Sequence, residues 1–370
     1  MGQGREACAR RGGRPNERAG SVAIMAGLFV GTTVSNPSVS QLATPRRIDI
    51  LIPVYNDWAA LMLLLPSLDR VLLGAGRTAQ LVVIDDGSFV RMPTEALTTG
   101  FDGIEKITVV SLRRNLGHQR AIAIGLAYVA AHTKPDVLIV MDGDGEDDPA
   151  DVRLLLDRAE AEQFGAVVFA ERRRRSEGAL FTTCYALYRW LHFVLTGIPV
   201  RVGNFSAVPA RQLQSLVVVS ELWNHYAAAV FKARIPRVLV PTARAHRLSG
   251  ESQMNFVSLV AHGLSAFSVH SELVGVRLLI GVMVLCVIAL AMLVAVIGIR
   301  LFTILAIPGW TTAAVGLILF FLTQAVAVAM SFIFLVLHAR SQPLFIPSRD
   351  FSYFVGEVYE VAKIRAENAG

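Results

Sequence analysis

Two long uncharged segments near the end of the 370-residue sequence restrict the possible folds of this chain more than any other feature. One covers residues 278–299, and the other covers 301–337 with Pro308-Gly309-Trp310 as an interruption. A helix needs about 20 apolar residues to cross a hydrocarbon core of roughly 30 Å. We therefore predict two transmembrane helices, at 276–299 and 312–337, with Trp310 at an interface. The alternative, two buried helices of a soluble core, would normally show a polar stripe that both segments lack.

Basic residues flank this hairpin unevenly. The connecting loop contains one, Arg300, whereas several precede or follow the pair: Arg247, Arg277, His338, Arg340, Arg349, Lys363 and Arg365. The positive-inside rule places both termini and residues 1–275 in the cytoplasm. We expect an integral protein of the cytoplasmic (inner) membrane whose catalytic domain faces the cytoplasm. A charged fraction of only 17% agrees, because it argues against a soluble globule, a disordered chain or a nucleic-acid-binding arm.

The first 45 residues differ from the rest in composition. Several arginines lie among Gly and Ala, and an apolar stretch follows from Val22 to Val34. The pattern is compatible with a secretory signal peptide or with translation that starts at Met25. We expect a disordered basic tail, because an export signal would place the next domain on the wrong side for the chemistry below.

Short apolar strands alternate with helices between Pro45 and about residue 240. We predict strands at 48–54, 80–84, 107–112, 136–141 and 166–170, and helices at 57–73, 117–132 and 149–162. This alternation indicates βαβ units in a mostly parallel sheet. In such sheets the ligand lies beyond the carboxyl ends of the strands.

Polar clusters follow three of these strands: Pro53-Val54-Tyr55-Asn56-Asp57, Asp85-Asp86-Gly87-Ser88 and Asp142-Gly143-Asp144-Gly145-Glu146. Asp142 and Asp144 have the spacing to reach one hard cation, and Mg²⁺ or Mn²⁺ prefers carboxylates together with phosphate oxygens. Glu146 is a third ligand or a base for a bound water. The alternative is an acidic turn that caps the helix beginning at Pro149.

These motifs, in this order, resemble those of family 2 glycosyltransferases. With Asn115-Leu116-Gly117-His118-Gln119 and the Arg247–Gln253 element, the chain is similar to the dolichol-phosphate mannose synthase and bactoprenol glucosyltransferase branch over residues 46–340. The resemblance implies a GT-A fold, which is an α/β, Rossmann-like domain with a mostly parallel sheet, followed by membrane helices. It also implies sugar transfer with inversion.

The resemblance assigns roles to individual residues. Nucleotide contacts are expected from Pro53, Tyr55, Asp57, Asp85 and Asp86, metal binding from Asp142, Asp144 and Glu146, and phosphate contacts near the membrane from Arg247 and Ser252. Asp142, Asp144 and Arg247 are the expected catalytic residues.

The chain departs from the family pattern at two phosphate-contacting positions. Gln253 stands where Lys is usual, and Gly203-Asn204-Phe205-Ser206 lacks an expected Arg. Arg201 or the run Arg172–Arg175 could compensate, although this run is also typical of a solvated or headgroup-contacting face.

The expected domains follow in order along the chain. They are a disordered tail (1–45), a GT-A domain (46–253), an amphipathic juxtamembrane helix (254–275), a transmembrane hairpin (276–340) and a cytoplasmic C-terminal tail (341–370). An ordinary core helix is the alternative for the juxtamembrane segment.

We expect a metal-dependent enzyme that moves a sugar from a nucleotide-sugar donor to a lipid carrier, with polyprenyl phosphate as the expected carrier. The expected partners are the donor, the lipid and the membrane but no nucleic acid, and homo-oligomerisation is left open. One alternative is a hydroxyl acceptor with Glu221 as general base. Another is a non-catalytic scaffold that binds nucleotide sugar.

Overall fold

The computed structural model describes residues 47–93, 100–172, 190–197, 202–243, 245–250, 264–304, 307–341 and 344–361. The expected tail at 1–45 lies outside these residues. So does most of the segment predicted as a juxtamembrane helix, which the structure describes only from residue 264.

A mixed eight-stranded sheet in the order β7-β5-β6-β4-β1-β2-β3-β8 organises the domain. Its strands are β1 (Ile48–Val54), β2 (Ala79–Asp85), β3 (Ile104–Leu112), β4 (Val137–Val140), β5 (Val167–Arg172), β6 (Val202–Pro209), β7 (Arg237–Thr242) and β8 (Val355–Val361). The four central strands β4, β1, β2 and β3 are parallel. β6 runs antiparallel to β4, and β8 runs antiparallel to β3. The expected α/β fold with a mostly parallel sheet is confirmed.

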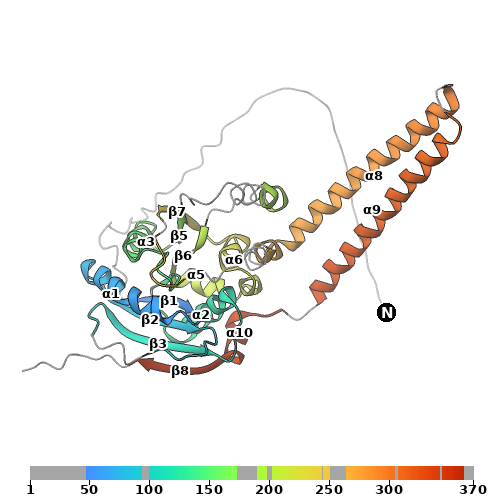
Figure 1. The fold of residues 1–370 in the computed structure, drawn as a ribbon. Helices are drawn as coiled ribbons and strands as arrows, with labels where there is room; N and C mark the ends of the chain where they lie inside the picture. The colour runs from blue at the N-terminus through green and yellow to red at the C-terminus, as the bar shows by residue number, and fades with distance from the viewer. Residues whose placement is uncertain are drawn as a thin grey trace, which may run out of the picture. The chain divides into compact units, whose positions relative to one another are not determined.

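Helices pack on both faces of this sheet (Figure 1). On one face lie α1 (Trp58–Gly74) and α3 (Pro149–Ala161), and on the other lie α2 (His118–His132), α5 (Ala210–Leu216), η2 (Ser220–Trp223) and α6 (Tyr226–Lys232). Side chains alternate across a strand, so Ile50 and Ile52 join the core beneath α1, whereas Leu51 joins the core beneath α2. Both faces of β1 are buried, which explains why its sequence is apolar apart from Asp49.

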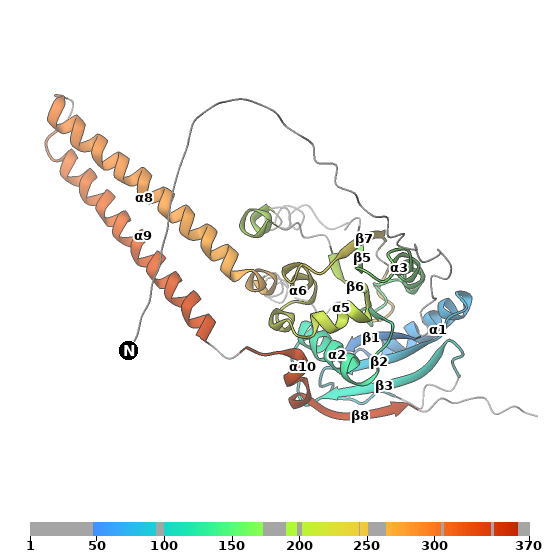
Figure 2. The ribbon, with the colours of Figure 1, turned by 180° about the vertical axis from the view of Figure 1, so that it is seen from behind.

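Two long apolar helices, α8 (Ser271–Phe302) and α9 (Trp310–Ser341), form an antiparallel hairpin that both views show (Figure 2). Both fit transmembrane spans by length and composition, and almost none of their apolar residues are buried in the protein. This exposure argues against two core helices. α8 begins five residues before the expected position, so Arg277 lies inside its second turn and not in front of it.

The segment after the hairpin is not a tail where the structure describes it. Residues 347–361 form α10 (Pro347–Asp350), η3 (Phe351–Tyr353) and the edge strand β8. β8 pairs with β3 over the register Ile107↔Val361 to Leu112↔Val355. The sequence of β8 is solvent-exposed and contains charged residues, unlike that of a buried central strand. It forms a strand because it pairs with β3. The expected tail at 341–370 is corrected to this extent.

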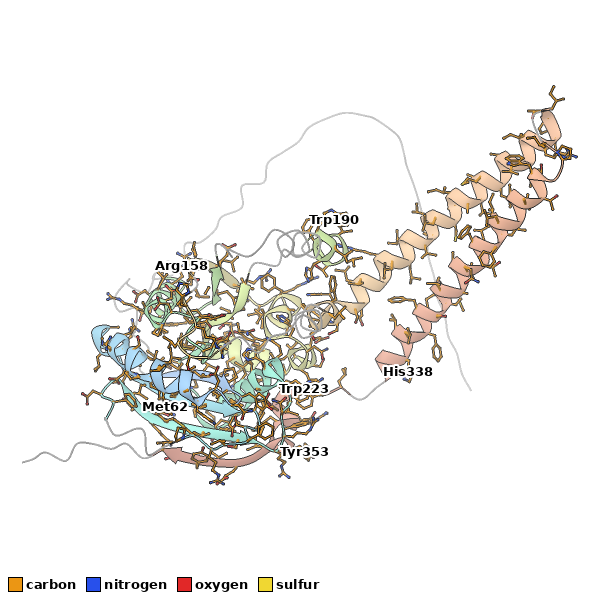
Figure 3. All side chains as sticks on the ribbon, in the orientation of Figure 1. Met62, Arg158, Trp190, Trp223, His338 and Tyr353 are labelled. Atoms are coloured by element: carbon orange, nitrogen blue, oxygen red, sulfur yellow. The ribbon has the colours of Figure 1, made fainter. Side chains whose placement is uncertain are left out.

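Aromatic residues attach the returning segment to the sheet domain. The ring of Trp223 lies 3.9 Å from that of Phe345 and 5.1 Å from that of Phe354, centroid to centroid. The Arg120 guanidinium of α2 lies 5.1 Å from the Trp223 ring. Figure 3 labels Trp223 together with Tyr353 of the returning segment. β8 completes the sheet, so it must lie on the same side of a membrane as the other strands. The chain between β7 and β8 would therefore cross a membrane an even number of times, as a two-helix hairpin does.

Candidate functional site

The carboxyl ends of three adjacent parallel strands bring the sequence motifs together. β1 is paired with β2 on one side and with β4 on the other. Asp57 lies just after β1, Asp85 ends β2, and Asp142 lies two residues after β4. The main-chain N–H of Asp86 donates to the carbonyl oxygen of Val54 over 2.8 Å, which ties the first two strand ends together. The three motifs therefore lie together at this edge of the sheet.

The acidic turn after β4 divides its carboxylates between two tasks. Asp147 is buried and accepts from the main-chain N–H of Asp142 over 2.9 Å. Asp148 caps α3 by accepting from the N–H of Ala150 over 2.9 Å. The helix-capping role, which was the alternative for the acidic turn, thus belongs to Asp148. Asp142 and Asp144 remain partly exposed at the strand end.

Gly145 permits this turn. Its φ of +85° lies in the left-handed region, where residues with a Cβ are disfavoured. An added Cβ would also lie 2.4 Å from Cγ of Leu248. Only glycine therefore lets the segment 245–250 lie directly over the acidic turn. Two main-chain hydrogen bonds fix that segment, from Leu248 N to Asp144 O over 2.9 Å and from Ala245 N to Glu146 O over 3.0 Å.

Arg247 connects two strand ends. Its Nη1 donates to Oδ2 of Asp144 over 3.1 Å, and its Nη2 donates to Asp57 after β1. Its Nε donates to the main-chain oxygen of Ser249 over 2.8 Å, which holds the guanidinium in place. The structure thus brings together three residues that the sequence placed in separate motifs.

The charge balance of the acidic turn suits a cation. Burial raises the pKa of the Asp144 carboxyl, and the nearby charges of Asp142 and Glu146 raise it further. The hydrogen bond from Glu146 N and the charge of Arg247 act in the opposite direction. Carboxylates that repel one another in a partly buried turn gain most from an added positive charge.

The donor set fits a divalent cation that uses two carboxylates. Among the described residues, no group of three His, Cys, Asp or Glu side chains is close enough to hold a metal ion. Glu146 is therefore not gathered with Asp142 and Asp144 into a three-ligand set. Mg²⁺ usually keeps several waters and takes one or two carboxylates together with substrate phosphates, so a site with only two carboxylates is compatible with its chemistry.

His118 at the start of α2 faces this turn. Its Nε2 lies 3.2 Å from Oδ1 of Asp142 and 2.9 Å from the side-chain nitrogen of Asn204. Asn204 accepts from Gln119, which in turn accepts from the main-chain N–H of Tyr226. Burial lowers the pKa of His118, but the charge of Asp142 and their hydrogen bond outweigh it, so the pKa is raised.

The ends of β1 and β2 form the expected nucleotide side. Asp85 accepts from Ser88 N over 2.8 Å and from Ser111 Oγ over 3.1 Å. Both oxygens of Asp86 accept from main-chain N–H groups, of Leu116 over 2.7 Å and of Gly117 over 2.9 Å. Asp86 therefore holds the loop that begins α2.

Two other expected nucleotide contacts lie on β1 or just after it. Pro53 lies within β1, opposite Ile84 of β2. Tyr55 follows the strand, and its ring centroid lies 6.2 Å from that of the exposed Phe89. Both residues thus remain at the strand end where the sequence placed them.

Glu221 is engaged elsewhere. One carboxylate oxygen lies 2.6 Å from Nζ of Lys232, and the other accepts from Ser220 over 3.1 Å. Burial raises its pKa, but the hydrogen bond from Lys232 and that residue's charge outweigh the effect and leave the pKa lowered. A carboxylate stabilised in this way is a weak proton acceptor, which disfavours the role of general base.

Some expected contacts fall outside the described residues. Ser252, Gln253, Arg201 and Arg173–Arg175 are among them, and so is the side chain of Arg172. Sequence reasoning underrated two residues that the structure places at the site. The sequence analysis gave His118 no role of its own and considered Asn204 only as part of a segment that lacks an expected Arg. The one available signal was the position of His118 in the loop that begins α2.

The comparisons with known proteins agree with this geometry. The family model described as glycosyl transferase family 2 matches residues 49–205, from β1 to the middle of β6. This match agrees with the GT-A fold class expected from the motifs.

The relatives include an undecaprenyl-phosphate 4-deoxy-4-formamido-L-arabinose transferase of Klebsiella pneumoniae, which is 28% identical over 225 residues. That match covers 58% of this chain and 64% of the relative, so the chain spans just under two thirds of the relative's length. An uncharacterized glycosyltransferase of Bacillus subtilis, YkcC, is 26% identical over 278 residues, which are 73% of this chain and 83% of that protein.

Similar solved structures have low sequence identity. Glucosyl-3-phosphoglycerate synthase from Mycobacterium tuberculosis, in complex with Mn²⁺, UDP-glucose and phosphoglyceric acid, is 18% identical with a TM-score of 0.44. That match covers 62% of this chain and 80% of the other. Mannosyl-3-phosphoglycerate synthase from Rubrobacter xylanophilus is 15% identical with a TM-score of 0.43, over 61% and 73% of the two chains.

Proposed function

Because the chain belongs to glycosyl transferase family 2 through residues 49–205, we propose that it transfers a sugar from a nucleotide-sugar donor to polyprenyl phosphate in a membrane. The undecaprenyl-phosphate transferases among its relatives support this class of acceptor. The apolar hairpin of α8 and α9 supports a membrane location. A lipid with a long apolar tail presents its phosphate at the bilayer surface, where a domain tethered by this hairpin would work.

One observation carries the proposal. Arg247, which belongs to the element that precedes the membrane helices, reaches back to Asp57 and Asp144 at the ends of β1 and β4. The catalytic edge of the sheet and the part of the chain that leads to the membrane therefore meet at one cationic side chain. A site that joins phosphates of a soluble donor to a phosphate at a bilayer needs such a junction.

We propose Asp142 and Asp144 as the residues that hold Mg²⁺ or Mn²⁺. When bound, the cation would supply positive charge to the departing diphosphate, the kind of electrostatic help that is usually the largest catalytic term. Arg247 adds a second, permanent positive charge beside Asp144. Tyr55 and Asp85 lie at the neighbouring strand ends and are proposed to hold the nucleotide.

The state of Glu221 favours a phosphate acceptor over a hydroxyl acceptor. A hydroxyl must lose a proton to a base within hydrogen-bond reach, whereas a phosphate is already anionic at neutral pH. Glu221 was the candidate base, and its ion pair with Lys232 lowers its pKa. A phosphate acceptor attacks without help from such a base.

We further propose that the catalytic domain faces the cytoplasm. The loop between α8 and α9 has little positive charge, whereas both flanks of the hairpin carry several basic residues. β8 pairs with β3, so the flank after the hairpin lies on the same side as the catalytic sheet. Nucleotide sugars would reach the site from that side.

The test is product formation with defined acceptors. The purified full chain in lipid nanodiscs is incubated with Mn²⁺, a panel of labelled nucleotide sugars, and either undecaprenyl phosphate or the matching alcohol undecaprenol. Extracted lipids are then treated with mild acid. The proposal expects an acid-labile product that forms with the phosphate and not with the alcohol.

Two results would contradict the proposal in different ways. An acid-stable product that forms equally well on the alcohol would favour a hydroxyl acceptor. Binding of a nucleotide sugar with no product from any donor would favour a non-catalytic scaffold. The acceptor pair thus separates an error about the acceptor from an error about catalysis.

A further inference from the structure

The strand β8, which follows the hairpin, lies in line with the end of β2 on the nucleotide side of the candidate site. Asp85 at the end of β2 pairs with Ser111 of β3, and Ser111 pairs with Glu357 of β8. Residues at paired positions share a face of the sheet, so these three form one row across it. Ser111 Oγ donates to Asp85 along this row over 3.1 Å. Figure 1 shows β8 along the outer edge of β3.

Glu357 also forms an ion pair with the loop that follows β2, residues 86–92. Nη2 of Arg91 in this loop donates to Oε2 of Glu357 over 2.7 Å. The two side chains are 77% and 50% exposed, and an ion pair open to solvent contributes little to overall stability. The pair therefore matters more for where the loop lies than for whether the sheet folds.

Tyr359 of β8 supports the same loop from within the domain. Its ring packs against the core beneath α1, which also includes Met92 of the loop, and its hydroxyl oxygen is buried. Burial raises the pKa of Tyr359 and the charge of Asp85 raises it further, whereas the charge of Arg91 and the main-chain N–H of Met92 act in the opposite direction. The Tyr359 side chain therefore lies between the end of β2 and the end of the loop.

The other side of the loop is bonded to the residues that follow β1. Asn56 N donates to Oγ of Ser88 over 2.8 Å, and Phe89 N donates to Oδ1 of Asn56 over 2.9 Å. Trp58 Nε1 donates to the carbonyl oxygen of Val90 over 2.7 Å. The loop is thus held between the end of β1 on one side and β8 on the other.

We propose that Glu357 and Tyr359 are positioning residues of the donor site, which hold the loop 86–92 in the conformation that receives the nucleotide. The proposal rests on the proposed function, because it takes the ends of β1 and β2 as the nucleotide side. It gives a role in donor affinity to a strand that lies after the hairpin, 266 residues from Arg91 along the chain. β8 pairs with β3 through main-chain groups at six residue pairs, so changes of these two side chains leave the strand in place.

Hydrogen–deuterium exchange of the full chain in lipid nanodiscs tests the positioning without any turnover. The variant combines Glu357→Gln with Tyr359→Phe, which nearly preserve side-chain size. Amides of the loop 86–92 should exchange about threefold or more faster than in the wild type, since exchange reports local opening. Glu360→Gln is the matched control, because this β8 residue pairs with Lys106 of β3 and not with the loop. Its loop should exchange at the wild-type rate.

Steady-state kinetics separate this role from a general loss of stability. The substrate is the nucleotide sugar that gives product in the donor panel, with undecaprenyl phosphate as acceptor. The combined variant should raise the KM for the donor about three- to tenfold, because it weakens binding and leaves the chemical step intact. Its kcat and its KM for undecaprenyl phosphate should stay within about twofold of the wild-type values.

Three results would overturn the proposal. They are unchanged exchange of the loop in the combined variant, equal effects in the Glu360→Gln control, and a fall in kcat at an unchanged donor KM. A different result would separate it from the proposed function. Faster loop exchange together with weaker binding of UDP or GDP in the presence of Mn²⁺, in a chain that forms no product with any donor, would support the positioning role and contradict sugar transfer.

Discussion

Replacement of Asp144 by Asn tests the candidate metal site most directly. Asp144 accepts from Glu146 N over 3.0 Å and from Arg247 over 3.1 Å. The Asn side chain can keep the first bond through its oxygen, but its amide then faces the guanidinium as a second donor. Arg247 retains Asp57 and the oxygen of Ser249. The turn should therefore persist while one anionic ligand is lost.

The expected loss of activity follows from the charge that a divalent ion would supply. If that contribution is about 4 kcal/mol, within the range for metal stabilisation of a leaving group, turnover falls about a thousandfold at ~1.36 kcal/mol per tenfold. EDTA should lower wild-type activity to a similar level, and Mn²⁺ or Mg²⁺ should restore it. The assay is the yield of labelled lipid per enzyme with a saturating nucleotide sugar.

Stability should change far less than activity. Loss of the charge-assisted bond to Arg247 costs free energy, but removal of a carboxylate whose pKa is raised by burial offsets it. We expect the free energy of unfolding to change by less than about 1 kcal/mol, which is a shift of only about 2–4 °C in a domain of this size. Because the raised pKa means that folding disfavours the charged form, wild-type stability gains as pH falls through the folded-state pKa toward the unfolded value. The Asn variant should lose that gain.

Asp148→Ala is the matched control. Asp148 caps α3 from the same acidic run and lies outside the proposed metal pair. Its removal should cost about 1 kcal/mol of stability, as is usual for an N-cap, and should leave activity nearly unchanged. Near-normal activity of Asp144→Asn, harmless chelation, or the same profile for both variants would refute the assignment of Asp144 to a metal site.

The remaining predictions concern the phosphate contact, the general base, the acidic turn and the topology. Arg247→Ala should lower activity about ten- to a hundredfold, as expected for loss of a charge-assisted hydrogen bond of roughly 1.5–3 kcal/mol, and unchanged turnover would exclude a phosphate contact. Glu221→Gln should change turnover by less than about threefold, because a phosphate acceptor needs no base, and a collapse of turnover in a folded protein would restore the hydroxyl-acceptor interpretation. Gly145→Ala should cost at least 1–2 kcal/mol, roughly the penalty for a positive φ, and should lower both melting temperature and activity, since the segment 245–250 must move; an unchanged melting temperature would contradict the close approach. A cysteine at Ile307 should react with an impermeant thiol reagent in intact cells and one at Ser352 only after permeabilisation, and the reverse pattern would overturn the cytoplasmic assignment.

Features that depend on neighbouring residues could be predicted from the sequence. β1 is buried on both faces and is apolar apart from Asp49, and its bounds at 48–54 match the prediction. The turn at 142–146 follows its strand because glycine and carboxylates end an apolar run. The two long helices were predicted because a bilayer selects for length and apolarity, although both extend beyond the predicted ends. The family and its α/β fold followed from motif order in the same way.

The assembly of the site was decided by the tertiary structure. Arg247 meets Asp144 across 103 residues and Asp57 across 190, and His118 meets Asn204 across 86. Such meetings depend on strand order, since β4 is the neighbour of β1 in the sheet although β2 and β3 come between them along the chain. Local patterns contain no information about that order.

The strand formed after the hairpin could not be predicted for the same reason. The sequence of β8, VGEVYEV, is half polar and largely exposed, so it has no buried-strand signal of its own. It becomes a strand because the edge of β3 offers unpaired main-chain groups that must find partners. The sequence by itself thus determined the strands β1 to β5, the acidic turn and the two long apolar helices, whose signals lie within a few residues. Only the tertiary structure decided which distant carboxylates share one arginine and which edge the chain completes after the hairpin, because these depend on contacts between residues far apart in sequence.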